Sequence, residues 1–236
     1  MNRKFAANAM SDTGKVRKGN EDSVFKAEDR GLFVVADGMG GGAEGEKASK
    51  WVCEEFAKAG TIEEMNTALE RANSKVYEYA KENRFKMMGS TVVAMKLGEN
   101  EGVIMWAGDS RAYRLRDGKV EQLTRDHTLG NELKKVATGQ MAKDLATRKH
   151  PLAHMLTKAI GTAEELKFEK TRFTLNAGDR FLMCTDGVHD LLSDEEIGVM
   201  LDKGKTREAA MAAIKAKVEE LGAHDNFTMI VVDVEG

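Results

Sequence analysis

Four aspartates stand beside apolar segments that are typical of buried β-strands. They are Asp37 after residues 32–36, Asp109 after 103–107, Asp186 after 181–184, and Asp225 before 227–232. Where such strand ends meet, four carboxylates converge, and the cluster repels itself unless a cation neutralises it. Carboxylate oxygens suit hard ions such as Mg²⁺ and Mn²⁺. The pattern therefore predicts a divalent metal site where these strand ends meet.

A plain turn is the competing explanation for each single aspartate, because aspartate is common in turns and Asp-Gly is a frequent turn dipeptide. Asp117-Gly118 is an example of such a turn, since it follows the polar stretch 114–116 and predicts an ordinary hairpin turn. Four aspartates that each stand beside a long apolar run favour a site. The glycines at 38 and 40–42 also leave the backbone free to fold closely around something small.

The composition is that of a soluble globular protein, with 236 residues, 42% hydrophobic and 32% charged. The chain has one proline, Pro151, and no linker-like stretch, which indicates a single domain over residues 1–236. The net charge of −3 argues against a general nucleic-acid binder.

No signal peptide, membrane span or zinc site is expected. Residues Met1–Phe5 lack an apolar core, and no stretch approaches the roughly 20 apolar residues that cross a membrane. Two cysteines, Cys53 and Cys184, fit a reducing compartment. The histidines show no HExxH-type spacing. We therefore expect a cytoplasmic protein.

The hydrophobic pattern predicts runs of strands and two pairs of helices. The predicted strands are 4–10, 23–27, 31–36, 90–97, 102–107, 111–116, 119–123, 167–174, 179–184 and 227–234. The predicted helices are 44–59, one beginning after Thr61, 193–202 and 206–221, with capping boxes at Thr61/Glu64 and Ser193/Glu196. Short turns between residues 90 and 123 predict antiparallel neighbours. Helices kept apart from strands indicate an α+β fold, a four-layer αββα sandwich of two antiparallel sheets packed face to face with helix pairs outside.

Residues 125–158 differ from the rest of the chain in charge. They carry seven basic residues (Arg125, Lys134, Lys135, Lys143, Arg148, Lys149, Lys158) and three acidic ones (Asp126, Glu132, Asp144). We predict one short helix at 129–136, followed by a loop through 138–140. The segment is either a solvated surface loop or a mobile flap that meets an anionic substrate.

Five motifs in order closely resemble the metal-dependent phosphatases of the protein phosphatase 2C family, with the bacterial single-domain members nearest in size. They are residues 11–22, 37–41, 108–111, 185–187 and 225–226. The resemblance covers essentially the whole chain and implies the same αββα layering. It implies a protein serine/threonine phosphatase that reverses a bacterial serine/threonine kinase.

The resemblance also implies a site that holds two Mn²⁺ or Mg²⁺ ions and a weaker third ion. Its implied ligands are Asp37 and the Gly38 carbonyl between the two ions, Asp186 and Asp225 at one ion, Glu21 and Asp22 near the other, and Asp109 at the third. Two such ions can activate a shared water that attacks phosphorus. Arg17 is our candidate for binding the phosphoryl oxygens, since a guanidinium binds two of them in one plane.

Met39 departs from the eukaryotic members, which have a histidine after Asp-Gly that protonates the leaving group. A metal-bound water is expected to take that role here, as in the bacterial members that lack this histidine. We expect His127, His150 and His189 to be surface or capping histidines.

The substrate side is less well defined. Lys143 and Arg148 are proposed to bind substrate and, with Lys149, to favour phosphopeptides in acidic context. The expected partners are phosphoproteins and a cognate kinase, with no nucleic acid, and a monomer is expected. Two other functions stay open: a catalytically silent metal-binding scaffold, and a phosphatase of small molecules. The intact acidic set and Arg17 argue against the scaffold, and the basic flap argues mildly against small molecules.

Overall fold

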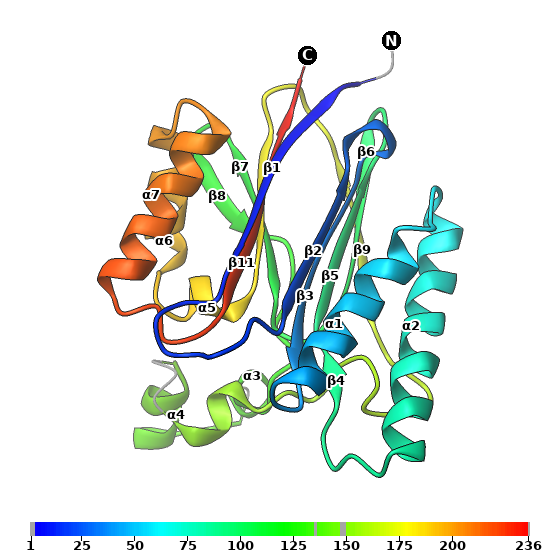
Figure 1. Ribbon diagram of the computed structural model, residues 1–236. Coiled ribbons are helices and arrows are strands. Elements are labelled where there is room, and N and C mark those ends of the chain that lie inside the picture. The colour runs from blue at the N-terminus through cyan, green and yellow to red at the C-terminus, as the bar shows by residue number, and fades with distance from the viewer. Residues whose placement is uncertain (1–2, 135, 147–149, 236) are drawn as a thin grey trace.

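The computed structural model describes residues 3–134, 136–146 and 150–235 (Figure 1). The strands are β1 (Phe5–Asp12), β2 (Asp22–Ala27), β3 (Leu32–Met39), β4 (Gly89–Ser90), β5 (Val92–Leu97), β6 (Glu101–Ala107), β7 (Arg111–Arg116), β8 (Lys119–Gln122), β9 (Glu169–Thr174), β10 (Arg180–Cys184) and β11 (Phe227–Val234). The α-helices are α1 (Ala43–Phe56), α2 (Ile62–Glu82), α3 (Leu129–Leu133), α4 (Gly139–Ala146), α5 (Asp186–His189), α6 (Asp194–Lys203) and α7 (Arg207–Glu220). Short 3₁₀ turns cover Glu28–Arg30 and Pro151–His154.

Two antiparallel sheets face each other. One has the strand order β1-β11-β10-β7-β8, and the other has the order β2-β3-β5-β6-β9, with β4 beside β3. Helices α6 and α7 cover the outer face of the first sheet, and α1 and α2 cover the outer face of the second (Figure 1). The predicted α+β sandwich with helix pairs outside is confirmed.

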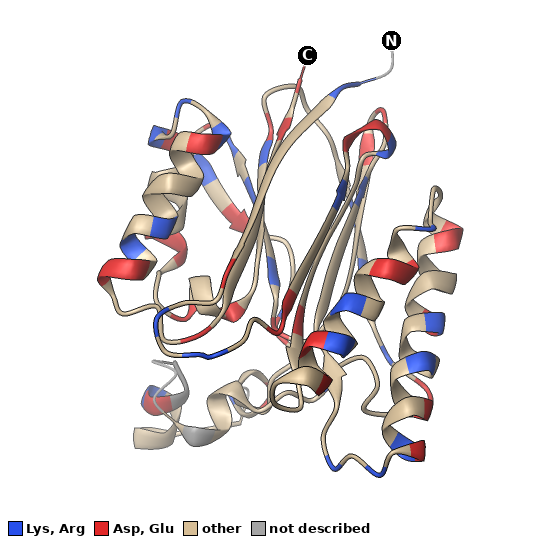
Figure 2. Ribbon diagram, viewed as in Figure 1, with Lys and Arg blue, Asp and Glu red and all other residues tan. Residues whose placement is uncertain are grey.

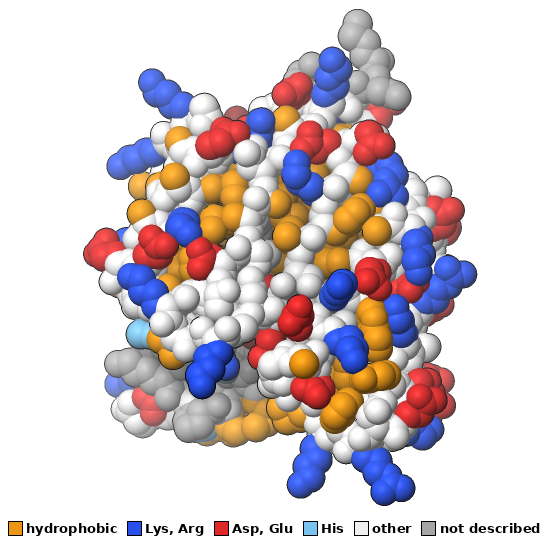
Figure 3. Space-filling model, in the orientation of Figure 1, with side chains coloured by type: hydrophobic (Ala, Val, Ile, Leu, Met, Phe, Trp, Pro, Cys, Tyr) orange, Lys and Arg blue, Asp and Glu red, His pale blue; other side chains and the backbone are white. Residues whose placement is uncertain are grey.

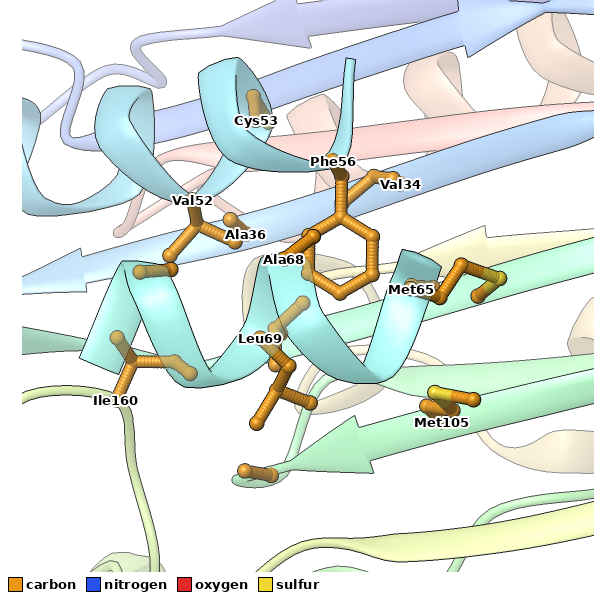
Figure 4. Close-up of a cluster of buried hydrophobic side chains, with 14 of the residues drawn as sticks. Val34, Ala36, Val52, Cys53, Phe56, Met65, Ala68, Leu69, Met105 and Ile160 are labelled. Carbon is orange, nitrogen blue, oxygen red and sulfur yellow. The ribbon is translucent and has the colours of Figure 1, made fainter. Parts of the chain in front are cut away.

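Strand β3 shows why its apolar run is unbroken. Alternate side chains of a strand point to opposite faces. Val34 and Ala36 therefore pack under the helices against Val52 and Phe56 of α1 (Figure 4). The residues between them, such as Val35, pack between the two sheets. Both faces of β3 are buried, so every position from 32 to 36 is apolar.

Helix starts follow the predicted caps. The Thr61 side chain accepts from the Glu64 N–H and the Glu64 carboxylate accepts from the Thr61 N–H, which begins α2. Ser193 and Glu196 begin α6 in the same way. Helix α7 ends at Glu220, one residue before the predicted end at 221, and Leu221 is exposed.

The segment from β6 to β7 does not form the expected hairpin. β6 pairs with β5 and β9, whereas β7 pairs with β8 and β10 in the other sheet. Gly108 turns the chain with a φ of 111°, and a Cβ there would lie 2.7 Å from the Thr91 Cβ. The crossing places Asp109 between the sheets. The turn at Asp117-Gly118, by contrast, is the predicted hairpin, with positive φ at both residues.

The segment 125–158 contains more helix than predicted. The helix at 129–136 ends early, at Leu133, and the predicted loop through 138–140 is instead the start of α4. Residues 140–143 are Gln, Met, Ala and Lys, which are good helix formers, so the local sequence accounts for α4. The single helical turn α5 was also not predicted. Throughout the described ranges, every helix is too short or too polar to span a membrane.

Candidate active site

The four aspartates that the sequence singled out lie around one cavity at the lower end of the sandwich. This cavity of about 250 Å³ is called the acidic pocket, and its lining includes Arg17, Glu21, Asp37, Gly38, Met39, Thr91, Asp109, His154, Leu156, Asp186, Asp225 and Asn226. Figure 2 shows acidic residues gathered at the lower ends of the strands. The strands of both sheets therefore contribute carboxylates to one pocket.

Asp22 and Asp37 are neighbours across the β2–β3 pair. Asp22 is buried, and its Oδ2 accepts a hydrogen bond of 2.9 Å from the Thr185 hydroxyl. Its other oxygen, Oδ1, is buried and has no hydrogen-bond partner among the described residues. A buried acceptor without a partner is costly. Asp22 Oδ1 therefore lacks a stabilising partner among the described residues, and a bound cation would provide one.

Burial raises the pKa of Asp22 to about 7, and the charges of Asp186 and Asp225 add to this effect. Burial also raises the pKa of Asp37 well above its ordinary value, and the neighbouring carboxylates raise it further, Asp22 most of all. The cluster resists full ionisation because its charges repel in a poorly solvated space. A divalent cation would relieve both costs.

The carboxylates surround the pocket without forming a closed cage. Within the described ranges, no three Asp, Glu, His or Cys side chains are spaced as a ready metal-ligand group. Mg²⁺ in proteins usually keeps several water ligands and binds only one or two carboxylates directly. An open, all-oxygen lining with an orphaned buried acceptor fits ions of this kind.

Arg17 lies at the rim of the pocket and is partly exposed. Its Nη2 donates to Asp225 Oδ2 over 2.6 Å, and this bond raises the pKa of the guanidinium. One arginine thus supplies positive charge to one of the four aspartates.

Comparison with known proteins agrees with this geometry. The family model for protein phosphatase 2C matches residues 15–220. The chain belongs to the protein phosphatase 2C family. The family expected from the motifs is therefore confirmed.

Relatives in this family include bacterial serine/threonine phosphatases. The serine/threonine protein phosphatase PstP of Mycobacterium tuberculosis is 35% identical over 96% of this chain, which spans only 44% of that relative's length. The serine/threonine phosphatase stp of Listeria innocua is 31% identical, over 94% of this chain and 93% of its own.

Solved structures of the family superpose on nearly the whole chain. PppA, described as a key regulatory component of T6SS in Pseudomonas aeruginosa, has a TM-score of 0.89 at 32% identity and covers 98% of both chains. The catalytic domain of PstP in complex with two manganese ions has a TM-score of 0.85 at 32% identity, over 99% of this chain and 100% of its own.

Glu21, in the same protein phosphatase 2C site, is held mainly through its backbone. Its carbonyl accepts from Gly38 N over 3.0 Å and from the Ser49 hydroxyl over 2.5 Å, and its carboxylate accepts from Gly42 N over 2.8 Å. A Cβ on Gly38 would overlap the backbone carbonyl of Gly45. Glycine at 38 lets the first turn of α1 close over the end of β3, beside Asp37.

Sequence reasoning missed two kinds of pocket residue. Asn226 is buried, and it lies just before the last strand. Its side chain accepts from Glu21 N and donates to the carbonyls of Thr13 and Gly19. These bonds join the first loop to the start of β11. His154 lines the pocket, with Nδ1 3.1 Å from Asp190 Oδ2. Asn226 stood within a recognised motif, which was a usable signal, whereas nothing in the sequence distinguished His154.

Two of the three histidines expected at the surface or at caps are buried, so that prediction was wrong for them. His127 Nδ1 accepts from Gly108 N over 3.2 Å, and His189 Nε2 bonds the Asp109 carbonyl over 3.0 Å. Both therefore support the segment that carries Asp109. His150 is a capping histidine as expected, since its Nδ1 accepts from Leu152 N.

None of the basic flap residues that the structure describes lines the pocket. Lys143 is exposed on α4 and does not line it, while Arg148 and Lys149 lie outside the described residues. The segment 125–158 instead contributes His154 and Leu156 to the lining.

Proposed function

We propose that this chain hydrolyses phosphoserine and phosphothreonine in proteins, and that Mn²⁺ or Mg²⁺ in the acidic pocket is required. Membership in the protein phosphatase 2C family supports the activity. The observation that carries the proposal for this chain is the acidic pocket, where aspartates from both sheets meet beside Arg17. One catalytic domain over residues 1–236 is part of the proposal.

The residues that would hold the ions follow from their place in the pocket and from the family motifs. They are Asp37 and the Gly38 carbonyl, Asp186 and Asp225, Glu21 and Asp22, with Asp109 for a weaker third ion. The orphaned oxygen of Asp22 supports its inclusion, although Asp22 lies beneath the lining. When bound, divalent ions lower the pKa of water and neutralise phosphoryl charge.

Arg17 would bind the phosphoryl group at the pocket rim. Its planar guanidinium has five N–H donors, and the hydrogen bond to Asp225 uses Nη2. A phosphate that enters the pocket can therefore be bound by the remaining edge of the same group, in the two-pronged manner of arginine. Met39 also lines the pocket but carries no exchangeable proton, so it cannot protonate a leaving serine or threonine oxygen.

The proposal includes a cellular setting. A serine/threonine kinase must supply the phosphoproteins, since this reaction removes what such a kinase adds. The buried, unpaired thiols of Cys53 and Cys184 support a reducing, cytoplasmic compartment. We propose that the chain acts there as a monomer, which size-exclusion chromatography with light scattering would test.

Phosphate release from a phosphothreonine peptide tests the activity, first with Mn²⁺ and then with excess chelator. We expect turnover that requires the metal and is lost in Asp186→Asn. A small phosphate ester, run in parallel, separates a protein phosphatase from a phosphatase of small molecules. A folded chain that binds Mn²⁺ yet releases no phosphate from either substrate would overturn the proposal in favour of a silent scaffold.

A further inference from the structure

A second cavity of about 320 Å³ opens beside the acidic pocket. Its lining includes Met39, Tyr77, Lys81, Phe85, Lys86 and Met87, and we call it the Met39–Met87 groove. Met39 also lines the acidic pocket, so the two spaces share a wall. The two spaces therefore adjoin at Met39.

The groove is built where α2 ends and the chain turns into β4. Arg84 adopts a φ of 56°, and Phe85 N then bonds the Ala80 carbonyl over 2.9 Å. The Phe85 ring packs on Tyr79, with 5.9 Å between centroids. These contacts hold the connection in place while the apolar residue Met87 stays 67% exposed.

The groove combines apolar surface with positive charge. Tyr77, Phe85 and Met87 supply the apolar part, and Lys81 and Lys86 supply the charge. Among the described residues no Asp or Glu lines it, in contrast with the acidic pocket next to it. Figure 3 shows basic side chains projecting at the lower edge of the molecule below α2, with hydrophobic ones nearby. Such a surface is complementary to a chain segment with an apolar and an acidic side chain.

The spacing of Asp37 and Met39 along β3 suits an extended polypeptide. Asp37 and Met39 are two residues apart in β3, which corresponds to about 7 Å. An extended peptide advances by a similar distance over two residues. A side chain two or three positions from a phosphorylated residue in the acidic pocket therefore reaches the groove.

We propose that the Met39–Met87 groove binds the substrate polypeptide two to three residues from the phosphorylated side chain, and selects an apolar residue next to an acidic one. This inference rests on the proposed function, since the phosphoryl group must sit in the acidic pocket. It assigns substrate selection to the connection between α2 and β4 rather than to the basic residues of segment 125–158, whose helix α4 lies on the opposite side of the molecule from α2 (Figure 1).

The test compares phosphothreonine peptides that carry Leu-Glu at positions +2 and +3, Leu-Glu at −3 and −2, or Ala-Ala at both. Fluorescence anisotropy with non-hydrolysable phosphonate versions of these peptides measures affinity on the parent chain with Mn²⁺, and kcat/KM is measured with the phosphopeptides. We expect one Leu-Glu peptide to bind about 10-fold more tightly than Ala-Ala, which is within the range that ion pairs from its Glu to the two lysines would give. Lys81→Glu with Lys86→Glu should abolish this preference, and Met87→Ser should reduce it.

A control variant tests whether the loss of peptide preference is specific to the lysines of the groove. Lys205→Glu, an exposed lysine between α6 and α7, should leave the preference intact. Thermal unfolding checks that each variant folds. Equal affinity for all three peptides, or a preference that survives in the double lysine variant, would overturn the inference. Failure of the parent chain to release phosphate from either the peptides or a small phosphate ester would count against the proposed function, and the affinity comparison decides the groove independently.

Discussion

Arg17 and Asp225, 208 residues apart in the chain, are joined by a 2.6 Å hydrogen bond between Nη2 and Oδ2 at the rim of the acidic pocket. Both side chains are substantially exposed, at 53% and 40%. An exposed ion pair contributes only about 0–1 kcal/mol to stability. The pair therefore affects chiefly the charge of the pocket, because Arg17 neutralises the carboxylate of Asp225. It also keeps the guanidinium at the rim of the pocket.

Arg17→Ala should reduce activity far more than stability. We expect kcat/KM for a small phosphate ester to fall by about 10- to 100-fold, because a charge-assisted hydrogen bond contributes about 1.5–3 kcal/mol. The free energy of unfolding should change by less than about 1 kcal/mol. Steady-state kinetics and urea denaturation measure the two quantities.

A matched control for this experiment is Arg172→Ala. Arg172 also forms an exposed ion pair, with Glu101 over 3.2 Å, but it lies on β9 and does not line the pocket. It should leave kcat/KM unchanged. Equal losses in the two variants would show that Arg17 has no special part in binding phosphate.

Asp37→Asn should abolish metal-dependent turnover while raising the melting temperature of the metal-free chain at pH 7. Burial and the surrounding carboxylates already disfavour the charge of Asp37, as its raised pKa shows, so a neutral amide removes repulsion. Phosphate release with Mn²⁺ and thermal unfolding in chelator are the measurements. An Asn variant that keeps Mn²⁺-dependent turnover would refute the assignment of Asp37 as a metal ligand.

Asn226→Ala should destabilise the chain by about 2–4 kcal/mol and lower turnover as well. The side chain makes three hydrogen bonds of 2.8–2.9 Å to the backbone of Thr13, Gly19 and Glu21, and each contributes about 0.5–1.5 kcal/mol. The loop that carries Arg17 and Glu21 then loses its anchor beside the start of β11. Denaturant unfolding compares this variant with Asn83→Ala, which removes an exposed bond to the Tyr79 carbonyl. Similar small losses in both would refute the anchoring role.

Protonation of His127 should make the chain less stable in mild acid. Its Nδ1 accepts from Gly108 N, so protonation there breaks that bond, and burial lowers the pKa of the ring from 6.5. Between the lowered folded pKa and about 6.5 the unfolded chain binds more protons, so stability falls as the pH decreases below about 6.5.

The groups around the His127 ring support this decrease of stability at lower pH. Glu169 lies 3.0 Å from Nε2 and favours the charged ring, whereas burial and Lys158 oppose it, and burial is the larger effect. His127→Asn keeps an acceptor for Gly108 and should flatten the dependence by up to about 1.4 kcal/mol per pH unit. Denaturation midpoints from pH 7 to 5 measure it, and parallel curves for the two proteins would contradict the prediction.

Local sequence predicted most of the elements and the chemistry. The unbroken apolar run before Asp37 predicted a strand covered on both faces, and the Thr61/Glu64 box predicted the start of α2. These features depend on neighbours within a few residues, so they can be read from one stretch of chain. The order of five short motifs was enough to indicate the family. Helix α4 also depends on local sequence, although a loop was predicted over its first residues.

What the sequence by itself determined is therefore the set of strands, the caps and the residue types of an acidic site. Only the tertiary structure decided that β6 and β7 part into different sheets, that Asp22 keeps an oxygen without a partner, and that His127 and His189 are buried behind Asp109. The joining of Asn226 to a loop 205 residues earlier, and the sharing of Met39 by pocket and groove, belong with these. All of them depend on contacts between segments far apart in the chain, and burial, charge and hydrogen bonding at such contacts are properties of the packed whole.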